Sequence, residues 1–426
     1  MARSSTAHDD ESSDPSAPVS WRRNLYALWI AQVLAIVGFT LRDSFLPFFL
    51  KDIGASDVDQ AALWSGLVQA GGAGVMAFAA PIWGIVADRK GRKPMVLRAM
   101  FAAMVTIGLM GLATAPWQLV ALRMVEGAFT GTVAASTALV ASTAPEERLG
   151  YALGMIQTAV FAGASFGPFL GGVMAAHLGF RPTFFIASGF LALGGALVYF
   201  TVQERFTAAP RSDVRGLAAV KASSTWLLAP TMVAMMAVLF VSRFAQMGVR
   251  PITPLYIAEV GNLSDARAAS VTGLAYGLLG VTSALSSIML GRRGDRAGHQ
   301  RILFLSVLGA GIIYLPMALI NAPWQMVLLQ ALFGIGAGGL IPAANAIIAQ
   351  RTTAERRGAI FGVTASVGAT GAFIGPLVGA GIAATLGFPA TFAFVGLVLI
   401  ALAAGLGYAL ATRRISSSTE ASLAAD

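Results

Sequence analysis

Two residues of opposite charge, Arg123 and Glu126, lie three positions apart within an otherwise apolar stretch at 117–142. Residues at this spacing share one face of an α-helix and can form an ion pair. Charged groups in such a stretch are costly to bury and usually face a partner or a water-filled space. Burial favours the neutral carboxyl of Glu126, whereas the Arg123 cation favours the carboxylate, so Glu126 is either a proton-carrying acid or half of a static ion pair.

Asp43 and Arg250 form a second pair of opposite charges, although they are 207 positions apart. This interval recurs throughout the chain, so the two residues are expected at equivalent places near the outer ends of the first and seventh helices. A bridge between them would close the outer side of the protein while its inner side is open. The alternatives are two hydrated helix ends, whose pairing contributes only about 0–1 kcal/mol, or a proton-carrying role for Asp43.

Arg243, Gln246 and Arg250 recur at roughly helical spacing and predict a polar stripe on the seventh helix. Tyr276 and Asn345 are further polar residues in apolar runs. Together these five residues are candidates for lining a substrate cavity, and the arginines favour anionic or zwitterionic ligands. In the competing interpretation Glu126 neutralises Arg243, which then contacts no ligand.

A short charged string occurs twice, at 84–93 and at 291–298, each time between two long apolar stretches. Its two glycines allow a tight, closely packed turn between helices. Its basic residues can pair with Glu146 or Glu147 in a neighbouring loop and so hold the two halves together on the inner side. Plain anchoring to anionic lipid headgroups also accounts for the basic residues, but not for the repeated aspartate. The candidate gating residues are Gly84, Asp88, Arg89, Gly91, Arg92, Lys93 and Asp295.

The elements that position these residues are expected to be transmembrane helices. The 426 residues are 56% hydrophobic and only 12% charged, about half the charge of a typical globular domain. A spanning helix needs roughly 20 apolar residues. Twelve stretches of that kind lie at 24–47, 63–86, 95–113, 117–142, 151–176, 182–203, 226–257, 269–290, 301–320, 324–349, 359–385 and 390–412. The polar N-terminus lacks the pattern of a cleavable signal peptide.

Most of the 29 Lys and Arg residues fall in alternate loops. Cytoplasmic loops carry such an excess, so the pattern places both termini in the cytoplasm and explains the net charge of +9 without nucleic acid as a partner. The absence of cysteine and the wide separation of the three histidines argue against thiol catalysis and a metal site.

An internal duplication organises the chain. Ala-Pro-Trp-Gln recurs at 115–118 and 322–325, Leu-Gly-Phe at 178–180 and 386–388, and Pro47 matches Pro254. Two six-helix bundles related by an axis along the membrane normal are one layout of transporters, with the substrate site between them. The expected divisions are a disordered tail at 1–20, bundles at 21–203 and 226–412, a cytoplasmic linker at 204–225 and a tail at 413–426.

These motifs resemble those of the major facilitator superfamily, and in particular its twelve-helix drug:proton antiporters. The loop string at 84–93 is similar to the superfamily motif between the second and third helices, and Arg123 with Gly127 is similar to the fourth-helix pattern. The fifth-helix antiporter pattern is matched by Gly163, Gly167, Pro168, Gly171 and Gly172. The resemblance to bacterial multidrug exporters covers about 21–412.

The resemblance implies an all-α polytopic membrane protein in the bacterial cytoplasmic membrane. It links Arg123 to proton transfer, and Glu126 departs from the glutamine that is frequent at that position. The glycines of the fifth helix let another helix approach closely, and Pro168 is expected to kink that helix.

The expected function is proton-coupled efflux of amphipathic small molecules or drugs by alternating access, in a monomer whose partners are protons, substrate and lipid. Importers or exporters of sugars, organic acids or siderophores on the same fold, and a membrane receptor or scaffold, remain alternatives. No Ser-His-Asp arrangement or phosphate-binding Gly-x-x-x-x-Gly-Lys loop supports an enzyme. The proton gradient takes the place of a cofactor. The sequence leaves the substrate and the proton stoichiometry open.

Overall fold

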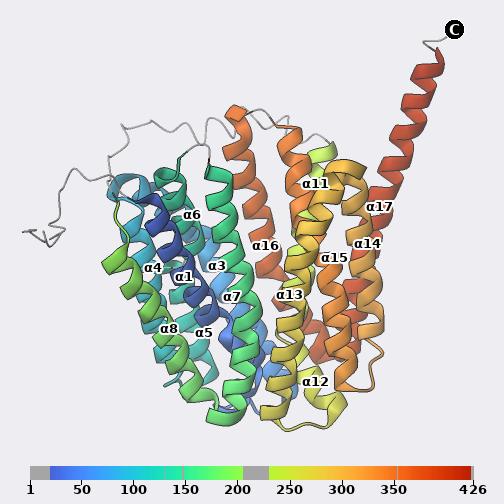
Figure 1. The fold of residues 1–426 in the computed structure, drawn as a ribbon. Helices are drawn as coiled ribbons and strands as arrows, with labels where there is room; N and C mark the ends of the chain where they lie inside the picture. Colours follow the sequence, from blue (N-terminus) through green and yellow to red (C-terminus); the bar gives the residue numbers. More distant parts are fainter. Residues whose placement is uncertain (1–19, 130, 146–147, 205–229, 353, 424–426) are drawn as a thin grey trace, which may run out of the picture.

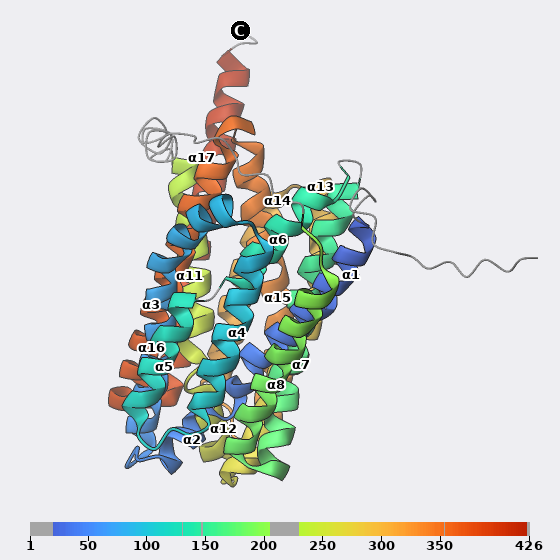
Figure 2. The same ribbon diagram turned by 90° about the vertical axis from the view of Figure 1, so that its left-hand side faces the viewer.

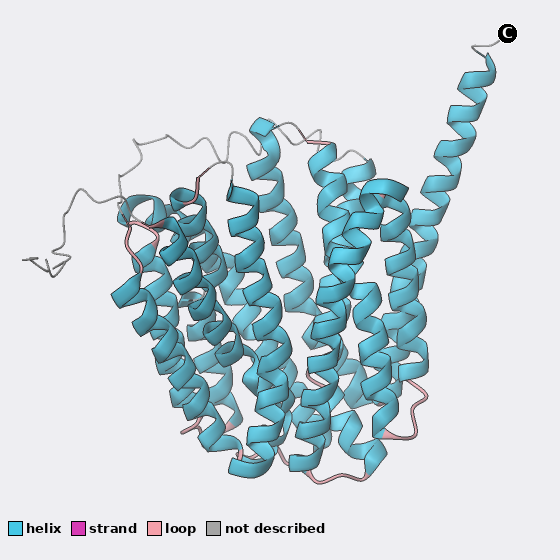
Figure 3. Ribbon diagram, in the orientation of Figure 1, coloured by secondary structure: helices cyan, strands magenta, loops and turns pink. Residues whose placement is uncertain are grey.

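The computed structural model describes residues 20–129, 131–145, 148–204, 230–352 and 354–423, without the side chains of Asp88, Pro230, 354–359 and 409–423. Its described residues are helices joined by short loops, and no strand occurs among them (Figure 3). Within these described ranges, twelve helical segments are long and apolar enough to cross a membrane, as the sequence predicts. The expected tail at 1–20 and linker at 204–225 lie almost entirely outside the described residues.

The described part of the first half contains nine elements in order. They are α1 (Trp21–Thr40), the 3₁₀ turn η1 (Leu41–Ser44), α2 (Leu46–Asp52), α3 (Val58–Lys90), α4 (Lys93–Met110), α5 (Pro116–Phe129), α6 (Thr132–Thr143), α7 (Leu149–Leu178) and α8 (Phe180–Thr201). The second half contains α11 (Pro230–Val249), α12 (Thr253–Gly261), α13 (Asp265–Ala297), α14 (His299–Met317), α15 (Pro323–Gln350), α16 (Ala354–Leu386) and α17 (Phe388–Leu423). The backbone of α17 continues well past the spanning segment that ends at Tyr408 and projects from the bundle (Figure 1).

The repeated Ala-Pro-Trp-Gln sequence begins a helix in each half. Proline occupies the first turn of α5 and of α15, where its missing N–H would have no helical partner. The side chain of Gln118 accepts a hydrogen bond from the Thr114 backbone N–H at 2.7 Å. Gln325 accepts one from Asn321 in the same way, at 2.8 Å. The duplicated motif is therefore a helix-start signal that satisfies free backbone donors.

Two other repeats are tight turns that need glycine. Gly91 and Gly298 have φ values of 94° and 92° in the turns α3–α4 and α13–α14. Gly179 and Gly387, with φ values of 87° and 85°, join α7 to α8 and α16 to α17. Side chains other than glycine rarely adopt this left-handed region, so the two halves use the same residue at the same corners.

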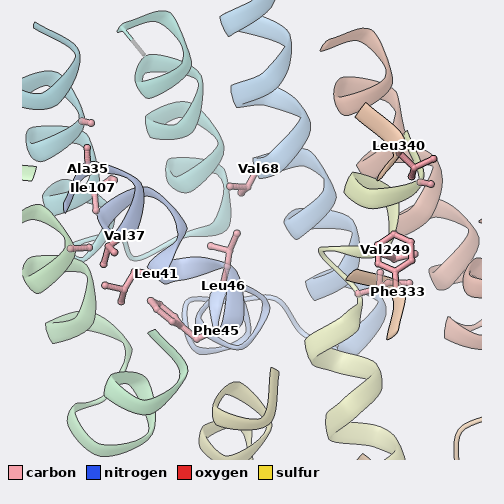
Figure 4. Packing of buried hydrophobic residues seen from close by; sticks show 14 of the residues in the cluster. Ala35, Val37, Leu41, Phe45, Leu46, Val68, Ile107, Val249, Phe333 and Leu340 are labelled. Atoms are coloured by element: carbon pink, nitrogen blue, oxygen red, sulfur yellow. The ribbon is translucent and has the colours of Figure 1, made fainter. Parts of the chain in front are cut away.

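The two halves lie side by side and converge at the end that carries α2 and α12 (Figures 1 and 2). Helix α7 packs along α13, and α3 packs along α16, so each half contributes two helices to the interface. Buried side chains such as Leu41 and Phe45 in the first half, and Val249 and Phe333 in the second, belong to one hydrophobic cluster (Figure 4).

Three spans expected as single helices are divided. The first is α1, η1 and α2, and the seventh is α11 and α12. Pro47 and Pro254 each lie in the first turn of the short second helix, which explains why this proline is repeated. The fourth span separates into α5 and α6 next to Gly131, whose φ is 124°.

Candidate functional site

The carboxylate of Glu126 is enclosed between two arginines in the middle of the first half. Its Oε1 accepts hydrogen bonds from Arg42 Nη2 at 3.0 Å and from Arg123 Nη1 at 2.7 Å. Glu126 is 1% exposed and Arg42 is 3% exposed. The second carboxylate oxygen, Oε2, is buried and has no hydrogen-bond partner. The structure thus brings Arg123 and Glu126 together and leaves one carboxylate oxygen available to bind a proton.

Close packing of backbone holds Arg123 in this position. A Cβ added to Gly72 of α3 would lie 2.7 Å from Arg123 Nε, so the guanidinium occupies space that only a glycine leaves free. A Cβ added to Gly127 would collide with the Gly72 carbonyl oxygen. Two glycines on adjacent helices therefore let α3 and α5 approach and seat the arginine between them.

Arg42 is the member of this triad that the sequence analysis missed. It lies in η1, directly before Asp43, and reaches Glu126 across 84 positions of sequence. The available signal was its charge within an apolar stretch, which requires a buried partner. The alternative in which Glu126 neutralises Arg243 is wrong, because the carboxylate pairs with Arg42 and Arg123.

Asp43 and Arg250 meet across the boundary between the halves. Arg250 Nη2 lies 2.7 Å from Asp43 Oδ2, so the contact expected from the repeat is present. Gln69 donates to the other carboxylate oxygen of Asp43 at 3.4 Å. The hydroxyl of Tyr276 donates to the Arg250 carbonyl at 3.0 Å, and the Arg250 guanidinium lies 5.5 Å from the centre of the Tyr276 ring. Tyr276 is 7% exposed and so belongs to this bridge.

A second bridge joins the halves at the same end. Lys51 Nζ contacts both carboxylate oxygens of Asp265 at 2.8 Å, and each side chain is 31% exposed. Burial raises the pKa of the neighbouring Asp52, and so does the Asp265 charge, while Lys51 and Arg181 lower it. The sequence analysis did not predict this contact.

The glycine pattern of the fifth span forms close contacts on two sides of α7. Added Cβ atoms at Gly163, Gly167 and Gly171 would collide with Ile36, Thr40 and the Leu41 carbonyl, respectively. On the other side, a Cβ at Gly172 would collide with the Ala269 carbonyl of α13, and one at Gly273 with the carbonyl of Pro168. The motif therefore fixes α7 against α1 in its own half and against α13 in the other half.

A family model described as Major Facilitator Superfamily matches residues 28–325 and 235–424. The chain belongs to this superfamily. It is therefore a multi-pass membrane protein and a secondary transporter, as the duplicated six-span halves predict.

Relatives in the superfamily cover nearly the whole chain. The multidrug resistance protein MdtG of Salmonella paratyphi A is 35% identical over 382 residues, which cover 89% of this chain and 93% of the relative. MdtG of Salmonella arizonae is 33% identical over 407 residues, covering 95% and 100%. The crystal structure of a bacterial homologue of the human lysosomal transporter Spinster has a TM-score of 0.73 at 14% identity and covers 94% of this chain and 98% of that one.

The superfamily loop string at 84–93 lies at the opposite end from the two bridges. A Cβ added to Gly84 would meet nothing within 4 Å, so the expected close packing at this glycine is wrong for this conformation. A Cβ added to Gly150, Gly154, Gly291 or Gly362, at the same end, would also meet nothing within 4 Å. The carboxylate of Glu204 accepts the backbone N–H groups of Arg92 and Lys93 at 2.8 and 2.7 Å, which caps α4.

The other loop residues fall in different places. Arg89 is exposed at the end of α3. Asp295 pairs with His299 of its own half at 3.2 Å and is 73% exposed. The side chain of Asp88 and both Glu146 and Glu147 lie outside the described residues.

The expected polar stripe is shorter than the spacing predicts. Helix α11 ends at Val249, so Arg250 lies in the following turn and only Arg243 and Gln246 are helical. Arg243 is exposed in the middle of its span and packs against Gly368 of α16. Asn345 is half-buried on α15. Arg98 stacks on Trp83 at 3.6 Å from the ring centre, a contact that the sequence analysis did not find. The described residues hold no group of three or more His, Cys, Asp or Glu that could bind a metal.

Proposed function

We propose that the protein is a proton-coupled exporter of amphipathic small molecules, with Glu126 as the acid that carries the proton. The observation that carries this proposal is the Glu126 carboxylate, buried between Arg42 and Arg123 with Oε2 unpartnered. Protonation of Glu126 would remove the charge that compensates both guanidinium groups. The network therefore has two states that differ by one proton, and a transporter needs such an element to couple an ion to a conformational change.

The ion pairs between the two halves indicate which end of the protein is closed. The described structure has ion pairs that join the halves, Asp43–Arg250 and Lys51–Asp265, at one end only. We assign that end to the outside, with both termini in the cytoplasm of a bacterial inner membrane, because the basic loops lie at the other end. In this assignment the structure is the conformation that loads substrate from the cytoplasm and releases the proton there.

Export rather than import is supported by the relatives at 33–35% identity, which are multidrug resistance proteins. Arg243 is exposed in the middle of its span, and its positive charge favours anionic or zwitterionic amphiphiles as substrates. The protein works without a bound cofactor, performs no chemistry on its substrate and functions as a monomer in this proposal.

Transport in everted membrane vesicles with a pH-sensitive dye tests the proposal. A proton gradient is generated and then challenged with cationic, anionic and zwitterionic amphiphiles. We expect substrate-dependent proton movement in the wild type and its loss in Glu126→Gln, with anionic or zwitterionic compounds giving the larger signal. Glu259→Gln is the matched control, because Glu259 is an exposed acid on α12. Coupled transport that survives in Glu126→Gln contradicts the assigned proton site, and transport without any proton movement contradicts antiport.

A further inference from the structure

A small pocket lies where the first and fifth spans begin, far from the charge network. It is formed at the N-terminal ends of α1 and α7, and its volume is about 170 Å³. Pockets for drug-sized ligands are larger, about 300–1,000 Å³, so this one suits a small chemical group. The lining residues are Trp21, Arg22, Leu25, Tyr26, Arg148 and Tyr151.

The lining is cationic and aromatic. Arg22 and Arg148 supply two guanidinium groups, and none of the six lining residues is acidic. Tyr26 on α1 and Tyr151 on α7 line the same pocket. Guanidinium forks match the geometry of phosphate oxygens and bind them with paired charge-assisted hydrogen bonds. The chemistry of the pocket therefore fits a phosphate group.

The position of the pocket indicates where such a phosphate comes from. Both spanning segments start at the pocket, at Trp21 and Leu149, so it lies at the edge of the membrane. Trp and Tyr are enriched at this depth, where their rings sit among lipid headgroups. Tyr26 is 49% exposed, and Ile30, one turn deeper on the same face of α1, is 45% exposed. An apolar surface thus continues from the pocket into the depth of the bilayer.

We propose that this pocket binds the phosphate of an anionic phospholipid, with Arg22 and Arg148 on the phosphate and an acyl chain along Ile30. Basic residues next to a span attract anionic lipid headgroups electrostatically. The ligand would hold the starts of α1 and α7 together through both arginines. This site is independent of the proton network and of the transported substrate.

Native mass spectrometry of the purified full-length protein, released from nanodiscs containing phosphatidylglycerol and phosphatidylcholine, tests the proposal. We expect the wild type to retain phosphatidylglycerol in preference to phosphatidylcholine. The double variant Arg22→Gln/Arg148→Gln is expected to lose about tenfold or more of that preference. Arg292→Gln/Arg293→Gln is the matched control, since it removes two exposed arginines from the last turns of α13, and it should retain the wild-type preference.

Three outcomes would overturn the proposal. One is an unchanged lipid preference in Arg22→Gln/Arg148→Gln. A second is an equal loss of this preference in the control variant, which would show that the overall positive charge, and not the pocket, retains the lipid. The third is displacement of phosphatidylglycerol by millimolar inorganic phosphate, which identifies a free-anion site. Thermal unfolding of each variant in detergent shows whether it is folded. If the double variant does not fold, Tyr151→Phe and the single variant Arg148→Gln provide the same comparison, with a smaller expected loss of the preference for phosphatidylglycerol.

Discussion

The two halves share a fold and differ sharply in what they bury at equivalent positions. Residues 42, 123 and 126 correspond to 249, 330 and 333 at the interval of 207. The first set is the triad of Arg42, Arg123 and Glu126. The second set is Val249, Gln330 and Phe333, which are 4%, 3% and 3% exposed. Val249 and Phe333 belong to the hydrophobic cluster in Figure 4.

This difference indicates that the charges serve function rather than folding. The ring of Phe333 packs against Tyr314 with 4.7 Å between the ring centres. At the place where the first half holds charged groups, the second half therefore has apolar contacts. Buried ion pairs are often no more stable than apolar groups of similar volume. The first half therefore retains an arrangement that stability does not require, and we attribute it to proton coupling.

The fourth spans of the two halves differ in a second way. Gly131 separates α5 from α6, whereas its counterpart Gly338 lies inside the continuous helix α15. A Cβ added to Gly338 would collide with Ser286 Oγ, so this glycine serves close packing against α13. Next to the break, Trp83 Nε1 donates to the carbonyl of Ala128 at 2.6 Å. The break is thus confined to the half that holds the charges.

The largest effect is expected when the first half receives the residues of the second. The triple variant Arg42→Val/Arg123→Gln/Glu126→Phe removes every charge of the triad, so no guanidinium is left uncompensated. We expect complete loss of substrate-dependent proton movement in vesicles, with a melting temperature equal to or above that of the wild type. The single variant Glu126→Phe is expected to melt lower, because losing one partner of a buried ion pair costs about 3–5 kcal/mol.

Coupled transport in the triple variant would show that the triad is structural. A triple variant less stable than Glu126→Phe alone would show that the charges contribute to folding after all. Either result removes the distinction between the two halves.

The next largest effect is expected at the bridge that joins them. Asp43→Arg places two guanidinium groups together, and Arg250→Asp places two carboxylates together, so each single variant destabilises the closed outer end. We expect each to lower the transport rate at least tenfold, which corresponds to about 1.4 kcal/mol or more. The double variant Asp43→Arg/Arg250→Asp restores the attraction and should recover a substantial part of the rate. Failure of the double variant to recover would leave Asp43 with a separate role, such as carrying a proton.

Much of this arrangement was accessible from the sequence, because it repeats. The interval of 207 makes Asp43 and Arg250 equivalent, and the family resemblance implies that their helices face each other, which together predict this contact. The three-residue spacing predicts the Arg123–Glu126 pair. Spans and glycine corners follow from hydropathy and from backbone constraints that act locally. Arg42–Glu126 and Lys51–Asp265 were not predicted, since each joins residues 84 or more positions apart that no repeat relates. Gly84 was misjudged because a glycine permits a close approach without requiring one, and a Cβ added there meets nothing within 4 Å in this structure.

Glycines at the two ends of the interface are expected to differ in their tolerance of a side chain. Gly172→Ala adds a Cβ that would collide with the Ala269 carbonyl, a backbone atom that cannot move without shifting α13. Gly84→Ala adds a Cβ that meets open space in this conformation. We expect a several-fold lower transport rate and a lower melting temperature for Gly172→Ala. For Gly84→Ala we expect an unchanged melting temperature, so that any loss of transport reflects the opposite conformation. Equal melting temperatures for the two variants would contradict the packing described at Gly172.

The smallest effect is expected at Lys51–Asp265, the more exposed of the two bridges. Its side chains are each 31% exposed, and exposed pairs contribute about 0–1 kcal/mol. Lys51→Ala should therefore shift the balance toward an open outer end by about fivefold at most, and less at high ionic strength because salt screens the pair. The chain has no cysteine, so maleimide labelling of Ser270→Cys reports this opening without background. Ser270 is half-buried here and donates to the Gly172 carbonyl at 3.1 Å. Labelling that is unchanged by Lys51→Ala at low salt would leave Asp43–Arg250 as the bridge that holds the halves.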